Sequence, residues 1–248
     1  MSRSRDLDWD GCLNVRDLGG HRTTDGGETR FGEIVRADSI RQLTDDGWRA
    51  AVEYGVRTVV DLRMDAELEA DPPAKLPVEV LHFPFFHDDE EAFAEVEAAS
   101  ESAADTASGT RDVYLVFLER FRANVAAAFG AVAHAPEGAV VVHCMGGKDR
   151  TGLLVALLLR VAGVDDAQIA ADYAVSEERL WPRHEAWLAE AGTDAERERV
   201  KRIAATPAGS MLGVLEELER RYGSVDAYLR AGGLGDDELQ LVRNRLRG

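Results

Sequence analysis

The sequence between residues 139 and 159 joins two apolar segments through a short loop that contains two glycines. Residues 139–142 are mostly valine, which predicts a buried β-strand, and residues 153–159 are a leucine-rich helix former. The loop between them, residues 143–152, reads His-Cys-Met-Gly-Gly-Lys-Asp-Arg-Thr-Gly. A strand that runs through such a loop into a helix N-terminus directs several backbone N–H groups toward one point. This segment therefore predicts an α/β fold with an anion-binding loop.

The side chains of the loop suit a phosphate ester. Gly146 and Gly147 allow the backbone to approach an anion closely, and the planar guanidinium of Arg150 can hold two oxygens at once. We expect Cys144 to be the nucleophile, because the helix dipole and the cations that bind the anion also stabilise a thiolate. The segment is not a nucleotide-binding loop of the Gly-x4-Gly-Lys-Ser/Thr type. A buried structural cysteine beside a helix cap is the alternative to this reading.

The loop resembles the signature of the cysteine-dependent tyrosine and dual-specificity phosphatases. Its Lys-Asp-Arg-Thr sequence resembles in particular an atypical bacterial branch of these enzymes, which includes the mycobacterial B-type phosphatases. The resemblance covers nearly the whole chain except residues 88–110 and 190–205. It implies a tyrosine-phosphatase-like fold, a phosphocysteine intermediate and hydrolysis of phosphotyrosine, with phosphoserine, phosphothreonine and phosphoinositides as further substrates and inorganic phosphate as product. The segments that carry it outside the loop are residues 14–20, 36–43, 59–63, 170–173 and 222–229.

Within this resemblance, Cys144 attacks phosphorus while Arg150 and the backbone N–H groups of the loop hold the three equatorial oxygens. We predict that Thr151 donates a hydrogen bond to the thiolate or only caps the helix, and that His143 orients the loop. Lys148 either contacts a second phosphate or lies in solvent. The predicted substrate-binding residues are Met145, Gly146, Gly147, Lys148, Asp149, Arg150 and Thr151.

Several aspartates are candidates for the general acid. We rank Asp149 first, because the atypical branch uses the aspartate at this place in proton transfer and its side chain adjoins Arg150. Asp61 ranks second, since it ends a predicted strand at the same edge of the sheet and can instead orient the loop. The other candidates are Asp65, Asp88 and Asp89.

The net charge of −17 argues against nucleic acid and against nonspecific binding to anionic membranes. No run of 18 apolar residues is present, so we expect no integral membrane contact. Because no two histidines have metal-ligand spacing, we expect neither a metal ion nor another cofactor. The N-terminal residues lack a hydrophobic signal core, which predicts a cytoplasmic protein, although the resembled branch includes proteins exported without such a signal. Cys12 has either a packing role or a redox role beside Cys144.

Alternating strands and helices without a linker predict one α/β domain over residues 1–248, with a parallel-dominated central sheet flanked by helices. We expect helices at residues 44–54 and 112–134, and strands at 56–62 and 78–85. Residues 88–110 form a flexible or helical acidic insertion. Residues 207–248 are helical and resemble a lid over the active site, or complete the core.

Two other functions remain open from the sequence. A sulfurtransferase or an arsenate-reducing enzyme also places a cysteine in an anion-binding loop, but the loop has one cysteine and continues as Arg150-Thr151. A phosphate-binding scaffold without activity is the non-enzyme alternative, and the presence of both Cys144 and Arg150 argues against it.

Overall fold

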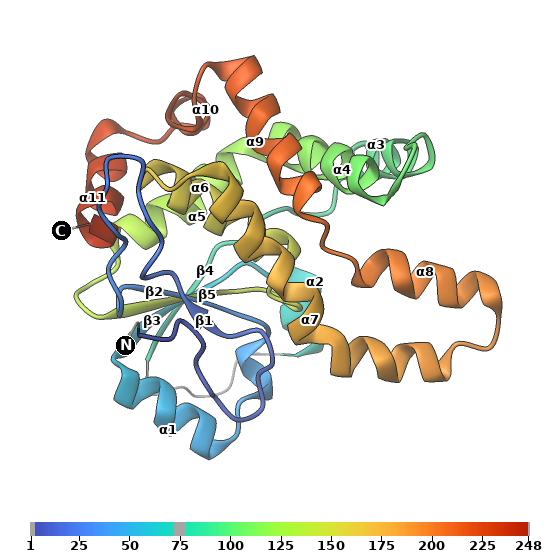
Figure 1. The fold of residues 1–248 in the computed structure, drawn as a ribbon, viewed down its shortest axis with the longest axis horizontal. Coiled ribbons are helices and arrows are strands. Elements are labelled where there is room, and N and C mark those ends of the chain that lie inside the picture. The colour runs from blue at the N-terminus through green and yellow to red at the C-terminus, as the bar shows by residue number, and fades with distance from the viewer. Residues whose placement is uncertain (1–2, 72–77, 248) are drawn as a thin grey trace.

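The computed structural model describes residues 3–71 and 78–247, and its centre is a five-stranded sheet (Figure 1). The strand order is β1-β2-β5-β3-β4, and all neighbours are parallel except β1 and β2. This confirms the predicted α/β fold with a parallel-dominated sheet. The strands are β1 (Arg16–Asp17), β2 (Ile34–Ala37), β3 (Val56–Asp61), β4 (Glu79–His82) and β5 (Ala139–His143).

Helices cover both faces of the sheet, so the central strand β5 is buried along its whole length. Helix α1 (Asp45–Tyr54) packs on one face with Val59 and Val141. Helices α5 (Arg122–His134) and α6 (Asp149–Val161) lie on the other face, as Figure 1 shows. Because β5 is central, the loop that follows it leaves the sheet between the ends of β2 and β3.

The ends of α1 follow from local chemistry. The Thr44 hydroxyl accepts a hydrogen bond from the Gly47 N–H at 3.2 Å, and Asp45 and Asp46 lie at the positive end of the helix. The helix stops at Gly55, whose φ of 109° suits glycine. The predicted helix over residues 44–54 is confirmed.

Residues 88–110 are largely helical, which is one of the two alternatives predicted for this acidic segment, whereas the long helix predicted after it differs from the structure. Helix α2 (Asp65–Ala70) follows β3, and residues 88–110 contain α3 (Glu90–Glu101), which packs against α4 (Thr106–Arg120). The single helix predicted over residues 112–134 is interrupted at Phe121. The buried Phe121 ring lies against Phe86, and the break lets α4 pack with α3 while α5 follows the sheet.

The C-terminal third is helical, as predicted. Helix α7 (Asp166–Glu190) and α8 (Asp194–Ala204) form a hairpin that extends away from the body (Figure 1). Helices α9 (Ala208–Tyr222), α10 (Val225–Ala231) and α11 (Asp236–Arg247) instead bury apolar side chains in the main core, including Met211, Tyr228 and Leu246. Within the described residues, no helix is both long and apolar enough to cross a bilayer.

Candidate active site

The loop after β5 lies at the carboxyl ends of the parallel strands. His143 pairs with Ala37 of β2 on one side and with Asp61 of β3 on the other, and Cys144 follows it with 2% of its surface exposed. Gly147 has a φ of 65°, and a Cβ there would lie 2.3 Å from the Ala37 carbonyl oxygen. The loop therefore packs directly against the end of the neighbouring strand, which only glycine permits.

Buried side chains hold the two glycines of the loop from behind. The Asn14 side-chain amide donates to the carbonyl oxygens of Gly146 and Gly147, each at 3.1 Å. Arg36 donates to the Gly147 carbonyl at 2.6 Å. These bonds fix the loop backbone relative to the strands, so the position of Cys144 depends on residues far away in the sequence.

The buried carboxylate of Asp172 on α7 compensates the arginines of this network. Its oxygens accept hydrogen bonds from Arg16 at 3.0 Å, from Arg36 at 2.6 Å and from Arg5 at 3.2 Å. Burial alone would favour protonation of Asp172, but the positive charges of Arg16 and Arg36 hold its pKa far below the ordinary value. Burial lowers the pKa of Arg36 to about 10. The cluster ties α7 to the strands that support the loop.

Glu67 of α2 holds the loop arginine. Its two carboxylate oxygens accept from Nη1 and Nη2 of Arg150, the latter bond at 2.8 Å. Burial disfavours the charge of Arg150, but the Cys144 sulfur and the Glu67 carboxylate raise its pKa above the ordinary value. The guanidinium carbon also lies 5.2 Å from the centre of the Phe86 ring. A guanidinium has five N–H donors, and Glu67 uses two of them, so three remain for an anion.

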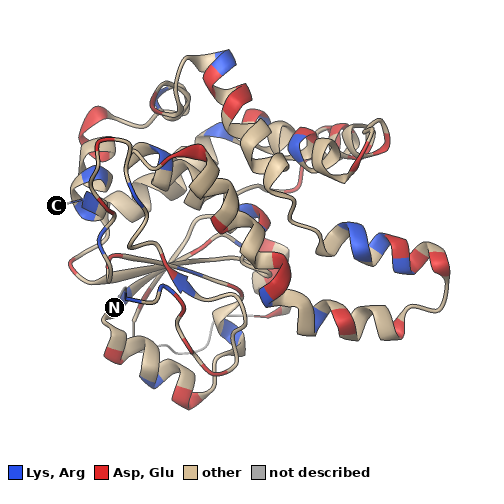
Figure 2. Ribbon diagram, in the orientation of Figure 1, with Lys and Arg blue, Asp and Glu red and all other residues tan. Residues whose placement is uncertain are grey.

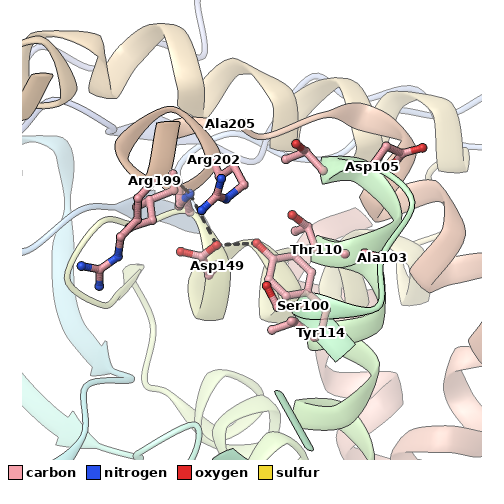
Figure 3. A pocket seen from close by; sticks show the side chains of 14 residues that line it. Ser100, Ala103, Asp105, Thr110, Tyr114, Asp149, Arg199, Arg202 and Ala205 are labelled. Atoms are coloured by element: carbon pink, nitrogen blue, oxygen red, sulfur yellow. Dashed lines mark hydrogen bonds and ion pairs between the residues drawn. The ribbon is translucent and has the colours of Figure 1, made fainter. Parts of the chain in front are cut away.

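Asp149, the first residue of α6, lies beside two buried phenols. The Tyr114 hydroxyl donates to Asp149 Oδ1 and lies 2.9 Å from the Tyr173 hydroxyl. Lys148 Nζ is 3.7 Å from the same carboxylate oxygen. Figure 3 shows Asp149 between the Tyr114 ring on one side and Arg199 and Arg202 of α8 on the other. The hydrogen bond from Tyr114 holds Oδ1 of Asp149 in place and so sets the orientation of the Asp149 carboxylate.

Asp61 lies behind the loop. Its carboxylate accepts from Arg63 Nε at 3.0 Å and from Arg63 Nη2 at 2.8 Å, and it is 3.5 Å from His143 Nε2. His143 Nδ1 in turn lies 3.1 Å from the Cys144 carbonyl oxygen, which suits the predicted orienting role of His143. Among the described residues that line the Cys144 pocket, Asp149 is present and Asp61 is absent.

Comparison with known proteins agrees with this geometry. The family model described as "Tyrosine phosphatase family" matches residues 7–248. This chain belongs to the tyrosine phosphatase family. It is 30% identical to the triple specificity protein phosphatase PtpB of Mycobacterium tuberculosis over 274 aligned residues, which cover 96% of each chain. It is 29% identical over 229 residues to a tyrosine-protein phosphatase of Nostoc commune, covering 86% of this chain and 74% of the relative. The predicted family and the predicted phosphatase activity are confirmed.

The pocket beside Cys144 has a volume of about 370 Å³. The loop forms one side of it, with Cys144, Met145, Gly146, Lys148, Asp149 and Arg150. The hairpin of α7 and α8 contributes the opposite wall, with Leu180, Arg183, His184, Trp187 and Ile203.

Contacts of Arg183 and Lys148 fasten the hairpin to the loop region, and one of them is a hydrogen bond from Arg183 Nη1 to the Met145 carbonyl at 3.5 Å. Lys148 Nζ donates to the Ile203 carbonyl, and Arg183 binds Asp38 at 2.8 Å. Residues 207–248, which resemble a lid in sequence, contribute no side chain to this pocket within the described part of the chain. They complete the core instead, because their apolar faces pack on α4, α5 and α7.

Other predicted residues of the phosphatase site lie as follows. Thr151 is fully buried, and its hydroxyl has no hydrogen-bond partner among the described atoms, so its proposed bond to the thiolate stays a prediction. Asp65 is exposed on α2, and Asp89 caps α3 by accepting from the Ala92 N–H at 3.0 Å. The Cys12 thiol donates to the Ser39 carbonyl, and burial raises its pKa, which makes it a poor nucleophile.

Three parts of the site had no clear signal in the sequence. Glu67 belongs to a short, strongly acidic helix, and Tyr114 is one of several apolar positions along α4. The α7–α8 wall includes Ile203, which lies in the segment 190–205 that carries none of the sequence motifs described above. Only the Asp-Leu-Arg segment just before α2 indicated that functional residues lie near Glu67.

Proposed function

We propose that this phosphatase hydrolyses phosphotyrosine in proteins through a phosphocysteine at Cys144. The observation that carries the proposal is that Cys144, Arg150 and Asp149 line one pocket. The Cys144 thiolate attacks phosphorus, the bond from phosphorus to the ester oxygen breaks, and the leaving oxygen takes a proton from Asp149. Water then attacks phosphorus and gives its proton to Asp149, the phosphorus–sulfur bond breaks, and inorganic phosphate leaves.

Arg150 stabilises the equatorial oxygens in both steps. Because Glu67 binds the two terminal nitrogens of Arg150, the guanidinium is held in one orientation before substrate arrives. Its three remaining N–H donors and the N–H groups of the loop bind the phosphoryl oxygens. In this scheme Glu67 is a positioning residue.

Asp149 is the proposed general acid. Tyr114 fixes its Oδ1, which leaves Oδ2 for the leaving oxygen of the substrate. The place of Asp61 behind His143 supports the other role considered for it, orientation of the loop. Asp149→Asn is expected to lose most turnover on an ester with a poor leaving group and less on an aryl phosphate.

The proposal extends to phosphoserine, phosphothreonine and phosphoinositides. The mycobacterial relative is named a triple specificity phosphatase, and the pocket wall includes Lys148, a further cation of the loop. A substrate with a second phosphate would find this ammonium close to the reacting group. A panel of phosphopeptides and soluble phosphoinositides, assayed for phosphate release, tests this range.

The experiment that tests the central proposal is phosphate release from an aryl phosphate in reducing buffer without added metal. Cys144→Ser is expected to abolish turnover, because a hydroxyl in this pocket is a far weaker nucleophile than a thiolate. The chain has two cysteines, so Cys12→Ser is the matched control and should keep wild-type activity. Full activity of Cys144→Ser would exclude the phosphocysteine. An inactive wild type that vanadate still stabilises against heat would support a phosphate-binding scaffold.

A further inference from the structure

A second cavity adjoins the pocket beside Cys144. Its volume is about 710 Å³, within the usual range for ligand pockets of about 300–1,000 Å³. It lies between the N-terminal half of α4 and the C-terminal half of α8 (Figure 3). Lys148, Asp149 and Ile203 line both cavities. A substrate whose phosphate lies at Cys144 can therefore reach the second cavity with a neighbouring group.

Two arginines of α8 give this cavity its distinctive chemistry. Arg199 and Arg202 line it, and within the described part of the chain neither makes an ion pair or a hydrogen bond. The other cations of the same helix are paired, Arg197 with Asp194 at 3.1 Å and Lys201 with Glu198 at 2.6 Å. The cavity thus presents two guanidinium groups to which no described carboxylate is bonded, although the pKa of Glu198, lowered first by its hydrogen bond from Lys201, is lowered further by the charge of Arg202.

The two carboxylates in the lining are already engaged. Asp149 accepts from Tyr114, and Asp105 caps α4 by accepting from the Ser108 N–H at 2.8 Å. The cavity also contains Lys148, so three cations face two bonded carboxylates. Figure 2 shows that the basic residues of α8 gather toward its C-terminal half, while acidic residues lie toward its start. Arg199 and Arg202, which line the cavity, belong to that basic half. In a chain with 46 acidic and 29 basic residues, such a site is a local exception.

We infer that this cavity is a second anion subsite, which binds an acidic group near the phosphotyrosine of a peptide substrate. The acidic group is a glutamate, an aspartate or a second phosphorylated residue. The inference rests on the proposed function, because it places the phosphotyrosine at Cys144. A peptide is favoured over a lipid surface, since the net charge of −17 repels an anionic bilayer as a whole, whereas a peptide carries a few charges into the cavity.

The test compares two double variants that remove the same charge from one helix. Arg199→Ala/Arg202→Ala removes the cations of the cavity, and Arg197→Ala/Lys201→Ala is the matched control. The substrates are a phosphotyrosine peptide with adjacent glutamates and the same peptide with glutamines. The first double variant is expected to lose about tenfold in kcat/KM on the acidic peptide, mainly through KM, which corresponds to two exposed charge contacts.

The loss should be confined to the acidic peptide, shrink as salt is raised, and be absent from the control variant. Equal losses on both peptides, or an equal loss in the control, would overturn the inference. So would a loss seen only with phosphoinositide in anionic vesicles. Turnover of p-nitrophenyl phosphate reports separately on the proposed function. If turnover fails, equilibrium binding of the two peptides to Cys144→Ser, with and without the α8 substitutions, still tests the subsite.

Discussion

Gly147→Ala is expected to disable the loop. A Cβ at this position would lie 2.3 Å from the Ala37 carbonyl oxygen, 2.5 Å from the Ala37 carbonyl carbon and 2.6 Å from the Asp38 nitrogen. All three are backbone atoms of the strand end, so no side-chain rotation relieves the contact. The φ of 65° adds a strain of about 1–2 kcal/mol for any residue with a Cβ. Together with overpacking of about 1–3 kcal/mol, the free energy of unfolding should fall by roughly 2–5 kcal/mol.

The effect on activity follows from what the loop carries. Restoring ordinary contact distances requires the loop to move by about an ångström relative to β2, and Cys144 and Arg150 move with it. A displacement of that size costs on the order of 10²-fold in rate. We therefore expect Gly147→Ala to lose about 10²-fold in kcat/KM on p-nitrophenyl phosphate, with a lower urea midpoint.

The adjacent glycine supplies the control. A Cβ at Gly146 would meet Leu180 and Lys148 side-chain atoms at 3.9 Å, an ordinary contact distance, and its φ is not positive. Gly146→Ala should therefore keep or slightly raise stability, by up to about 1 kcal/mol. If the two variants unfold at the same denaturant concentration, the packing argument for the loop is refuted.

Three further predictions concern the residues around the loop. Tyr114→Phe removes the hydrogen bond that orients Asp149 and should lower kcat severalfold on alkyl phosphates but little on aryl phosphates. Equal losses of kcat across a series of leaving groups would contradict this role of Tyr114. Asp172→Asn leaves buried arginines without their counter-ion and should cost about 3–5 kcal/mol in urea unfolding, and a cost below about 1 kcal/mol would be inconsistent with the ion cluster. Burial lowers the pKa of His21 to about 4 in the folded protein, against an ordinary 6.5. Between these pH values the His21 side chain binds a proton in the unfolded chain but not in the folded protein. The free energy of unfolding should therefore decrease by up to about 3 kcal/mol as the pH falls from 6.5 to 4. In the His21→Gln variant, the curve of unfolding free energy against pH should be flatter over this range.

The parts of the fold that the sequence predicted depend on local chemistry. A valine run, a glycine loop and a leucine helix lie within 21 residues, and each determines its own conformation without distant partners. The same holds for α1, where Thr44 and Gly55 mark the two ends. The interruption at Phe121 had no such local signal, because apolar residues continue at helical spacing through it and the break follows from packing.

The parts of the site that were not predicted depend on contacts between distant segments. Glu67 and Arg150 are 83 residues apart, and Tyr114 and Asp149 are 35 apart. Neither Glu67 nor Tyr114 is an unusual residue type for its helix. Their contacts with Arg150 and Asp149 are therefore visible only in the tertiary structure. The sequence left residues 207–248 open between a lid and a part of the core for a related reason. These residues and the α7–α8 hairpin are both helical in sequence, and only packing shows which of them lines the Cys144 pocket.

The charge of this protein illustrates why net charge is a poor guide to the sign of a ligand. Arg16 and Arg36 share the one buried carboxylate of Asp172, and Arg63 binds Asp61, so N–H donors of these three cations are used within the protein before any ligand arrives. The pair of Glu67 and Arg150 differs from these. Glu67 accepts hydrogen bonds from two of the five N–H donors of Arg150, which fixes the orientation of the guanidinium and leaves three donors free for a ligand. Without Glu67, Arg150 would have all five N–H donors available for a ligand, but its guanidinium would not be held in one orientation. In the proposed mechanism, this acidic chain binds an anion because Glu67 positions Arg150 without occupying all its N–H donors.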